Sequence, residues 1–194
     1  MGHDKNNINL NFNVIKITLR AAALLMFLVP ALTYASIWVL VDTKDAVIKI
    51  MDGKKPVLTL EDISLGRSGV TDLHIKGDDK TPRGVFSIVR INRDSQFRTF
   101  FEINYPTINH AQDAVNKGII DNKTYTRIKI SQQASGKSPR DTVLGGNLGI
   151  HGIGAGDPLV HEMFNWTNGC IALTNNQIDQ LSQWVHIGTK VVIE

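Results

Sequence analysis

Ile150-His-Gly-Ile153 and Trp166-Thr-Asn-Gly-Cys-Ile-Ala-Leu173 place one histidine and the chain's single cysteine each beside a glycine. Both segments include short apolar runs, so we expect each of the two residues at the end of a buried strand. A thiol is a useful nucleophile only as the thiolate, and a histidine that accepts its proton makes the thiolate accessible. The pattern therefore predicts a nucleophilic site with Cys170 as nucleophile and His151 as general base.

The glycines of the two segments let the backbone approach a substrate carbonyl closely. The backbone N–H groups of Gly169 and Cys170 would then stabilise the oxyanion that forms when sulfur attacks that carbonyl. The alternative is a buried structural cysteine beside a hydrogen-bonded core histidine. Thiol labelling separates the two: an activated Cys170 reacts rapidly near neutral pH and loses this reactivity in His151→Ala, whereas a structural thiol is inert in both chains.

The remaining histidines do not suggest a metal enzyme, because no pair has the spacing of a zinc hydrolase. His151 and His161 share a segment with Asp157 and Glu162, but such a set of polar loop residues is more often solvated. The glycines between residues 145 and 156 do not match a dinucleotide-binding fingerprint. We therefore expect neither a metal nor an organic cofactor.

Composition indicates one globular domain, with 194 residues of which 42% are hydrophobic and 20% charged. Lys5, Lys16 and Arg20 against Asp4 contribute +2 of the net charge of +3. The other charges are balanced and dispersed, which excludes the basic stripe of a nucleic-acid-binding protein. A single cysteine excludes an internal disulfide framework.

The N-terminal segment, residues 1–35, has the organisation of a secretory signal peptide. Residues 1–20 are polar and carry Lys16 and Arg20, and residues 21–35 are uncharged and end in small residues. The uncharged run continues to Val41, which is also long enough for a retained membrane anchor. In both cases we expect export to the periplasm or cell envelope, with membrane contact only through this segment if it is retained.

Downstream of residue 36, short apolar runs separated by turn residues predict a mainly β domain with a few short helices. Thr174 and Gln177 have the spacing of a capping box, so a helix is expected to begin there. Residues 152–166 are expected to form a loop. The expected strands cover 37–42, 46–51, 57–65, 85–91, 99–104, 147–151, 169–173 and 189–194, and the other expected helices cover 108–117 and 121–133.

His151, followed after fifteen residues by Thr167-Asn-Gly-Cys170, resembles the catalytic domain of L,D-transpeptidases (YkuD type), cysteine enzymes that remodel peptidoglycan. Trp38-Val-Leu-Val-Asp42 and Thr81-Pro-Arg-Gly-Val-Phe86 match further segments of that family. The resemblance spans residues 36–194 and implies a mixed β-sandwich of this type. Asn168 stands where the family usually has a second histidine, and Ala172 stands where many members have Arg or Asn.

The resemblance implies a reaction on peptidoglycan stem peptides without a cofactor. Cys170 would attack the carbonyl at the L-centre of the third stem residue, D-Ala would leave, and an amine would take the acyl group. The product would be a 3-3 crosslink or an attached lipoprotein, and carbapenems would acylate the enzyme. An L,D-carboxypeptidase or amidase with water as acceptor, and an inactive cell-wall-binding module, are the alternatives.

The resemblance also implies roles for the residues that flank the two reacting groups. Gly152 would supply a backbone carbonyl that orients His151. Trp166, Thr167 and Asn168 would contact the substrate, although Trp166 is equally well explained as a core anchor.

Overall fold

A computed structural model of the chain describes residues 1–2 and 37–194. Apart from its first two residues, the predicted signal peptide or anchor, residues 1–35, lies outside the described residues. Within the described ranges, no helix combines the length and the apolar composition needed to span a bilayer.

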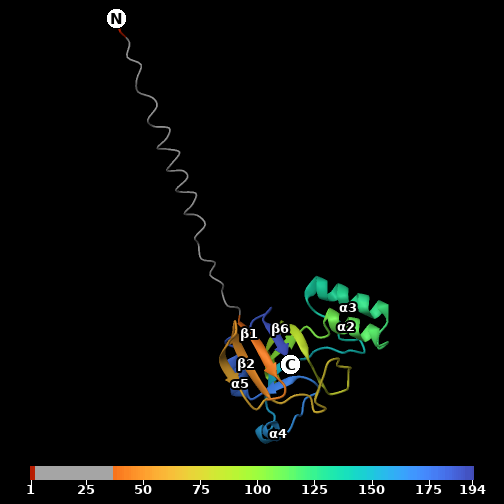
Figure 1. Ribbon diagram of the computed structural model, residues 1–194. Coiled ribbons are helices and arrows are strands. Elements are labelled where there is room, and N and C mark those ends of the chain that lie inside the picture. The colour runs from red at the N-terminus through yellow and green to blue at the C-terminus, as the bar shows by residue number, and fades with distance from the viewer. Residues whose placement is uncertain (3–36) are drawn as a thin grey trace. The chain divides into compact units, whose positions relative to one another are not determined.

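The domain is built on an eight-stranded mixed sheet (Figure 1). Its order is β3-β2-β1-β10-β6-β7-β8-β9, and β1·β10 and β8·β9 are its parallel pairs. The long strand β6 joins two halves, because residues 84–87 pair with β10 and residues 88–95 pair with β7. The strands are β1 (Ile37–Asp42), β2 (Val47–Asp52), β3 (Lys55–Leu60), β6 (Gly84–Ser95), β7 (Arg98–Ile103), β8 (Gly149–Gly152), β9 (Ile171–Leu173) and β10 (Lys190–Ile193), with β4 (Val70–Thr71) and β5 (Thr81–Pro82) forming a separate parallel pair.

Alternating apolar residues in β1 and β2 build one part of the core. Val39 lies opposite Ile50 and Val41 opposite Ile48, and all four side chains are fully buried. Burial of each such side chain contributes about 1.5–3 kcal/mol. The short strands β8 and β9 are buried along their whole length, and the helix that follows β9 packs against both strands. The predicted mainly β fold with a mixed sheet and a few short helices is confirmed.

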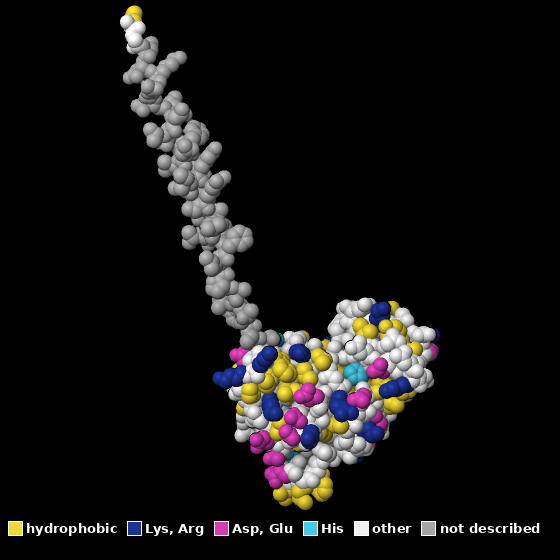
Figure 2. All heavy atoms as spheres, in the orientation of Figure 1, with side chains coloured by type: hydrophobic (Ala, Val, Ile, Leu, Met, Phe, Trp, Pro, Cys, Tyr) yellow, Lys and Arg dark blue, Asp and Glu magenta, His cyan; other side chains and the backbone are white. Residues whose placement is uncertain are grey.

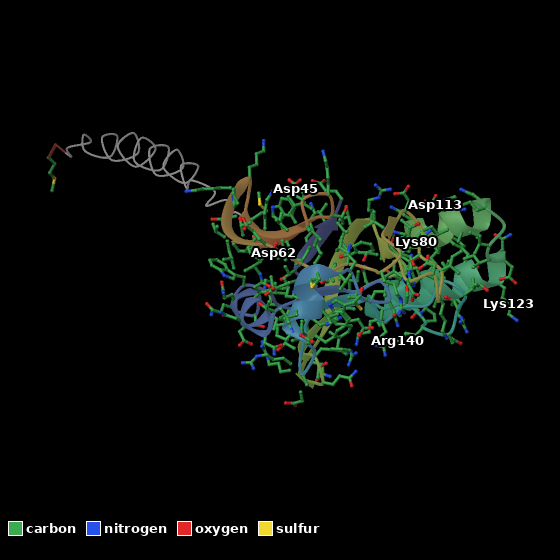
Figure 3. All side chains as sticks on the ribbon, turned by 90° about the horizontal axis from the view of Figure 1, so that it is seen from below. Asp45, Asp62, Lys80, Asp113, Lys123 and Arg140 are labelled. Atoms are coloured by element: carbon green, nitrogen blue, oxygen red, sulfur yellow. The ribbon has the colours of Figure 1, made fainter. Side chains whose placement is uncertain are left out.

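The four helices are α2 (Ile108–Asn116), α3 (Asn122–Ser135), α4 (Pro158–Met163) and α5 (Asn175–Leu181). The predicted capping box at α5 is present, because Gln177 N–H donates to Thr174 Oγ1 and Thr174 N–H donates to Gln177 Oε1. Helix α2 packs against α3 as a pair beside the sheet. Figure 3 shows Asp113 and Lys123 on this pair, at the opposite end of the domain from Asp45.

Two expectations are corrected by the structure. The predicted loop 152–166 contains α4, whose first N–H groups are capped by Asp157 (2.9 Å to Leu159 N); six residues are too few to show helical periodicity. The predicted strand 57–65 ends at Leu60, because Asp62 has a left-handed φ of 56°. The chain then turns so that Ser64 pairs with Ala172.

Candidate active site

The register of β8 and β9 brings His151 and Cys170 to the same face of the sheet. His151 lies opposite Ala172 in this parallel pair. Side chains two residues apart in an extended chain point to the same side, so Cys170, two positions before Ala172, faces the same way as His151. Ala172 itself is fully buried.

His151 is buried and held in one orientation. Its Nδ1 lies 2.8 Å from the carbonyl oxygen of Gly152, so Nδ1 carries the proton and Nε2 is free to accept one. The rings of Phe97 and Trp166 pack against the imidazole, with centroids 4.3 Å and 5.9 Å away. Burial lowers the pKa of His151 below its ordinary value. The resting imidazole is therefore neutral, as a general base must be.

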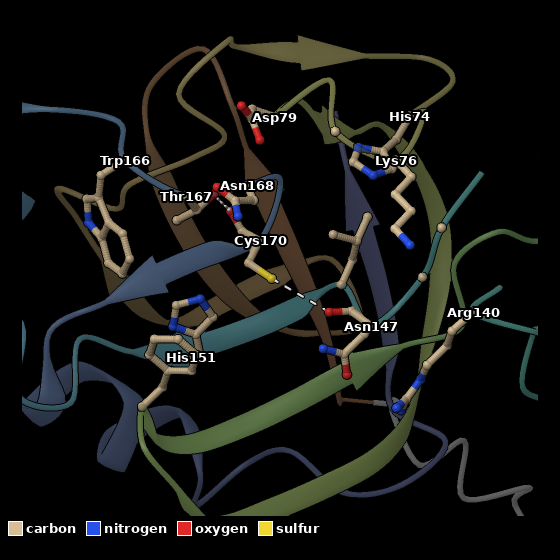
Figure 4. A pocket seen from close by; sticks show the side chains of 15 residues that line it. His74, Lys76, Asp79, Arg140, Asn147, His151, Trp166, Thr167, Asn168 and Cys170 are labelled. Carbon is tan, nitrogen blue, oxygen red and sulfur yellow. Dashed lines mark hydrogen bonds between the residues drawn. The ribbon is translucent and has the colours of Figure 1, made fainter. Parts of the chain in front are cut away.

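Cys170 follows a tight turn at the entrance to β9. Its Sγ points toward the backbone carbonyl of Asn147 at 3.9 Å (Figure 4). Burial raises the pKa of the Cys170 thiol to about 11. The neutral form of the resting thiol is thus favoured near neutral pH, and the rapid reaction expected of an activated Cys170 stays a prediction that labelling tests. Thiol and imidazole form a neutral pair, and the proton must move during the attack itself.

This state predicts slow alkylation of native Cys170. Near neutral pH, iodoacetamide should label the native chain on the order of 10²-fold more slowly than the urea-unfolded chain, whose thiol has an ordinary pKa of about 8.5. The native rate should rise tenfold per pH unit until the pH approaches the pKa of the buried thiol. Mass spectrometry of the labelled chain measures both rates, and equal rates near neutral pH would contradict the neutral pair.

The turn before Cys170 uses one of the two backbone N–H groups predicted to bind the oxyanion. Gly169 N–H donates to Thr167 Oγ1 (3.1 Å), and that hydroxyl donates to the carbonyl oxygen of Cys170 (2.6 Å). Gly169 N–H is therefore engaged inside the turn, which leaves Cys170 N–H as the candidate oxyanion donor. Thr167 is buried, and its hydroxyl forms both of these hydrogen bonds within the turn.

A cavity of about 700 Å³ opens over the two reacting side chains. Trp166 lies on its wall, with its Nε1–H 3.4 Å from His161 Nδ1. Asn168 is exposed at the rim, and its Oδ1 accepts a hydrogen bond from Arg67. The lining residues are His74, Lys76, Gly77, Asp79, Phe97, Arg140, Gly145, Gly146, Asn147, Leu148, His151, Trp166, Thr167, Asn168 and Cys170.

Several lining residues come from segments that the sequence motif does not include. His74 and Lys76 lie in the loop before β5, and Arg140 and Asn147 lie in the segment between α3 and β8. The two adjacent glycines at 145 and 146 are the available signal in the sequence, since glycine pairs favour loops. Nothing in the local sequence, however, showed that these loops cover Cys170.

Two cationic side chains, Lys76 and Arg140, line the cavity together with one carboxylate, Asp79. Glu102 is buried and binds Arg90 at 2.6 Å and Arg140 at 2.5 Å, so two guanidinium groups share one carboxylate. Lys76 is exposed and has no ion-pair partner within the described part of the chain. The Lys76 side chain is suited to bind a ligand that carries carboxylates.

The described residues contain no cluster of three His, Cys, Asp or Glu side chains that could hold a metal ion. The functional groups that line the cavity are the Cys170 thiol, the imidazoles of His74 and His151, and the charged side chains of Lys76, Asp79 and Arg140.

Comparison with known proteins places these features in a family. The family model of the L,D-transpeptidase catalytic domain (YkuD) matches residues 36–193. Among solved structures, the helical cell shape determining protein Pgp2 from Campylobacter jejuni has a TM-score of 0.55 at 24% identity, over 82% of this chain and 47% of that chain. Bd1075 from Bdellovibrio bacteriovorus has a TM-score of 0.52 at 16% identity, over 85% of this chain and 50% of that one.

These structural matches support the predicted fold type, and the present chain spans about half the length of both proteins. The search of curated proteins found no match.

Proposed function

The chain belongs to the L,D-transpeptidase catalytic domain family, and from this premise we propose that it is a peptidoglycan-remodelling cysteine L,D-transpeptidase. The observation that carries the proposal is the position of Cys170 and His151 on one face of adjacent strands, beneath a cavity of about 700 Å³. A catalytically inactive wall-binding module would not require a histidine, His151, whose Nε2 can accept a proton, at the same cavity as the chain's single cysteine.

The first half-reaction forms a thioester. His151 Nε2 takes the Cys170 thiol proton while sulfur attacks the carbonyl carbon at the L-centre of the third stem residue. Cys170 N–H donates to the resulting oxyanion. The C–N bond to the terminal D-Ala then breaks, and His151 returns its proton to the departing amine. Gly152 keeps the imidazole in the required tautomer through its carbonyl oxygen.

The second half-reaction decides the product. An amine from another stem gives a 3-3 crosslink, and a lysine amine of a lipoprotein gives an anchored lipoprotein. Water as acceptor makes the same site an L,D-carboxypeptidase or amidase. All these reactions proceed through the same acyl-enzyme on Cys170. The acceptor therefore has to be identified from the product that is formed.

Recognition of the stem peptide is supported by the charge of the cavity. Stem peptides carry carboxylates, and the exposed Lys76 side chain, which has no ion-pair partner among the described residues, lines the cavity. Trp166 and Asn168 lie on the side of the cavity near the nucleophile (Figure 4). We propose that they contact the donor stem, and that Thr167 acts through the turn.

The location of the substrate determines where the enzyme must work. Peptidoglycan lies in the cell envelope, so residues 1–35 are proposed to export the domain to the periplasm or to anchor it there. Pgp2 is described as a cell-shape-determining protein, and a contribution to cell shape is the corresponding proposal for this chain. No nucleic acid or cofactor is part of the proposed function.

The test is incubation of the full chain with a diaminopimelate-containing tetrapeptide muropeptide, followed by mass spectrometry. A crosslinked dimer is expected, and Cys170→Ala should lower its formation by at least about 10³-fold. Tripeptide without dimer would instead establish hydrolysis by the same site. Unchanged tetrapeptide with the unsubstituted chain would contradict both reactions.

A further inference from the structure

A second histidine, His74, lines the cavity and has no part in the reaction described above. In the view of Figure 4, His151 lies on one side of the Cys170 sulfur and His74 on the other. The His74 residue is only 3% exposed. A buried imidazole on the wall of a reaction cavity needs a structural or a chemical explanation.

His74 is paired with a carboxylate. Its Nδ1 lies 2.7 Å from Asp78 Oδ1 and 2.8 Å from the carbonyl oxygen of Lys80. Both neighbours are acceptors, so Nδ1 carries a proton and donates to them. Nε2 has no hydrogen-bond partner among the described residues, and it is therefore the nitrogen available to a ligand.

The carboxylate partner is itself held in place. Asp78 Oδ2 accepts from Ile75 N–H at 2.9 Å, and Asp78 Oδ1 accepts from Lys80 N–H at 3.0 Å. On the other side of the imidazole, the ring of Tyr105 packs edge-on with centroids 5.5 Å apart, and its hydroxyl donates to the His74 carbonyl oxygen at 2.6 Å. The histidine is thus oriented by contacts independent of His151 and Cys170.

The turn that carries the nucleophile lies directly against this histidine. A Cβ added at Gly169 would be 3.3 Å from His74 Cε1 and 3.4 Å from His74 Nδ1. Cys170 is the next residue, and its side chain and the His74 imidazole line the same cavity.

The two imidazoles differ in their partners. His151 Nδ1 faces a neutral carbonyl among aromatic rings, which suits a base that holds a proton only briefly. His74 Nδ1 faces an anchored carboxylate, and such a partner stabilises the positive charge that the ring acquires when it takes a proton. The second property favours a base that removes a proton from an acceptor.

We propose that His74, oriented by Asp78, is a second catalytic base of this site and acts on the acceptor that resolves the acyl-enzyme. The inference rests on the proposed function. The acceptor amine or water attacks the thioester carbon, and its proton passes to His74 Nε2. The C–S bond breaks with its electron pair on sulfur, His74 releases the proton to solvent in the cavity, and Cys170 takes up one proton.

The test compares the full chain with His74→Gln on the tetrapeptide muropeptide. Released D-Ala measures acylation, and intact-protein mass spectrometry measures the acyl-enzyme. His74→Gln should release one equivalent of D-Ala at a rate close to that of the parent chain. Turnover should then be about 10²-fold slower, since a general base contributes at least this factor, and the acyl-enzyme should accumulate. Asp78→Asn should give the same pattern more weakly.

His110→Gln is the matched control for loss of a buried histidine. His110 also packs against Tyr105, with ring centroids 4.9 Å apart, but it does not line the cavity. Its substitution should not cause acyl-enzyme accumulation.

Each result has a defined meaning. Equal slowing of acylation and turnover in His74→Gln, without acyl-enzyme accumulation, would overturn the role of His74 while leaving the proposed function intact. Failure of the parent chain to release any D-Ala would overturn the proposed function and the inference together. An accumulating acyl-enzyme in His110→Gln would also overturn the role, because the effect would then follow from loss of packing.

Discussion

His151→Gln is expected to lower the rate of D-Ala release by about 10³-fold or more near neutral pH. The reason is the neutral state of the resting pair. Burial holds the Cys170 thiol at a pKa of about 11, so about 0.01% of it is ionised at pH 7. Without an imidazole to take the proton during the attack, the reaction must rely on this small thiolate fraction.

The same argument gives the pH dependence of the variant. Its residual rate should rise tenfold per pH unit and level off near pH 11, whereas the parent chain should lose activity at low pH, as His151 becomes protonated. Burial lowers the pKa of His151, so this loss should begin below the ordinary histidine range. D-Ala release at a series of pH values measures both profiles, with Cys170→Ala as background. A variant with the parent profile would exclude His151 as the base.

His186→Gln is the matched control for this series. His186 is exposed, and its contacts are with Thr189 before the last strand. The substitution should leave the pH profile unchanged.

Gly169→Ala is expected to lower both the stability of the domain and the activity of the site. Gly169 has a φ of 116°, which L-residues rarely adopt, and an added Cβ would lie 2.7 Å from the Lys80 carbonyl oxygen and 3.3 Å from His74 Cε1. Strain and overlap together should cost about 3 kcal/mol or more of the free energy of unfolding. For a domain of this size, that corresponds to a fall in Tm of roughly 10 °C.

Activity should fall with stability in Gly169→Ala, because any relief of the overlap moves the turn that aims Cys170. Thermal unfolding gives the Tm, and D-Ala release per folded molecule gives the activity. Gly188→Ala separates the two causes, since Gly188 has a φ of 92° but no heavy atom within 4 Å of an added Cβ. Gly188→Ala should therefore lower the free energy of unfolding only through backbone strain, by about 1 kcal/mol. Equal losses of Tm and of activity in the two variants would show that the overlap with Lys80 and His74 does not contribute to the effect of Gly169→Ala.

Local sequence patterns were sufficient for most of the sheet. The strand 37–42 was predicted with its observed bounds, because a short apolar run followed by a turn indicates a strand locally. The capping box at Thr174 depends on only four residues and was also predicted. Helix α4 and the end of β3 were missed, because a six-residue helix and a single left-handed residue leave no periodic signal.

The spacing of His151 and Cys170, with their glycines, was enough to predict that the two residues come together at one site, since residue types and strand ends can be recognised from local sequence. Three properties of the site followed only from tertiary structure: the neutral thiol, the engaged Gly169 N–H and the presence of His74 on the cavity wall. The neutral thiol follows from desolvation of Cys170 by the residues packed around it. The second depends on the geometry of one turn, and the third on a loop about ninety residues earlier in the chain that packs against Gly169. Desolvation and contacts between distant segments are properties of the packed domain, so no local motif specifies them.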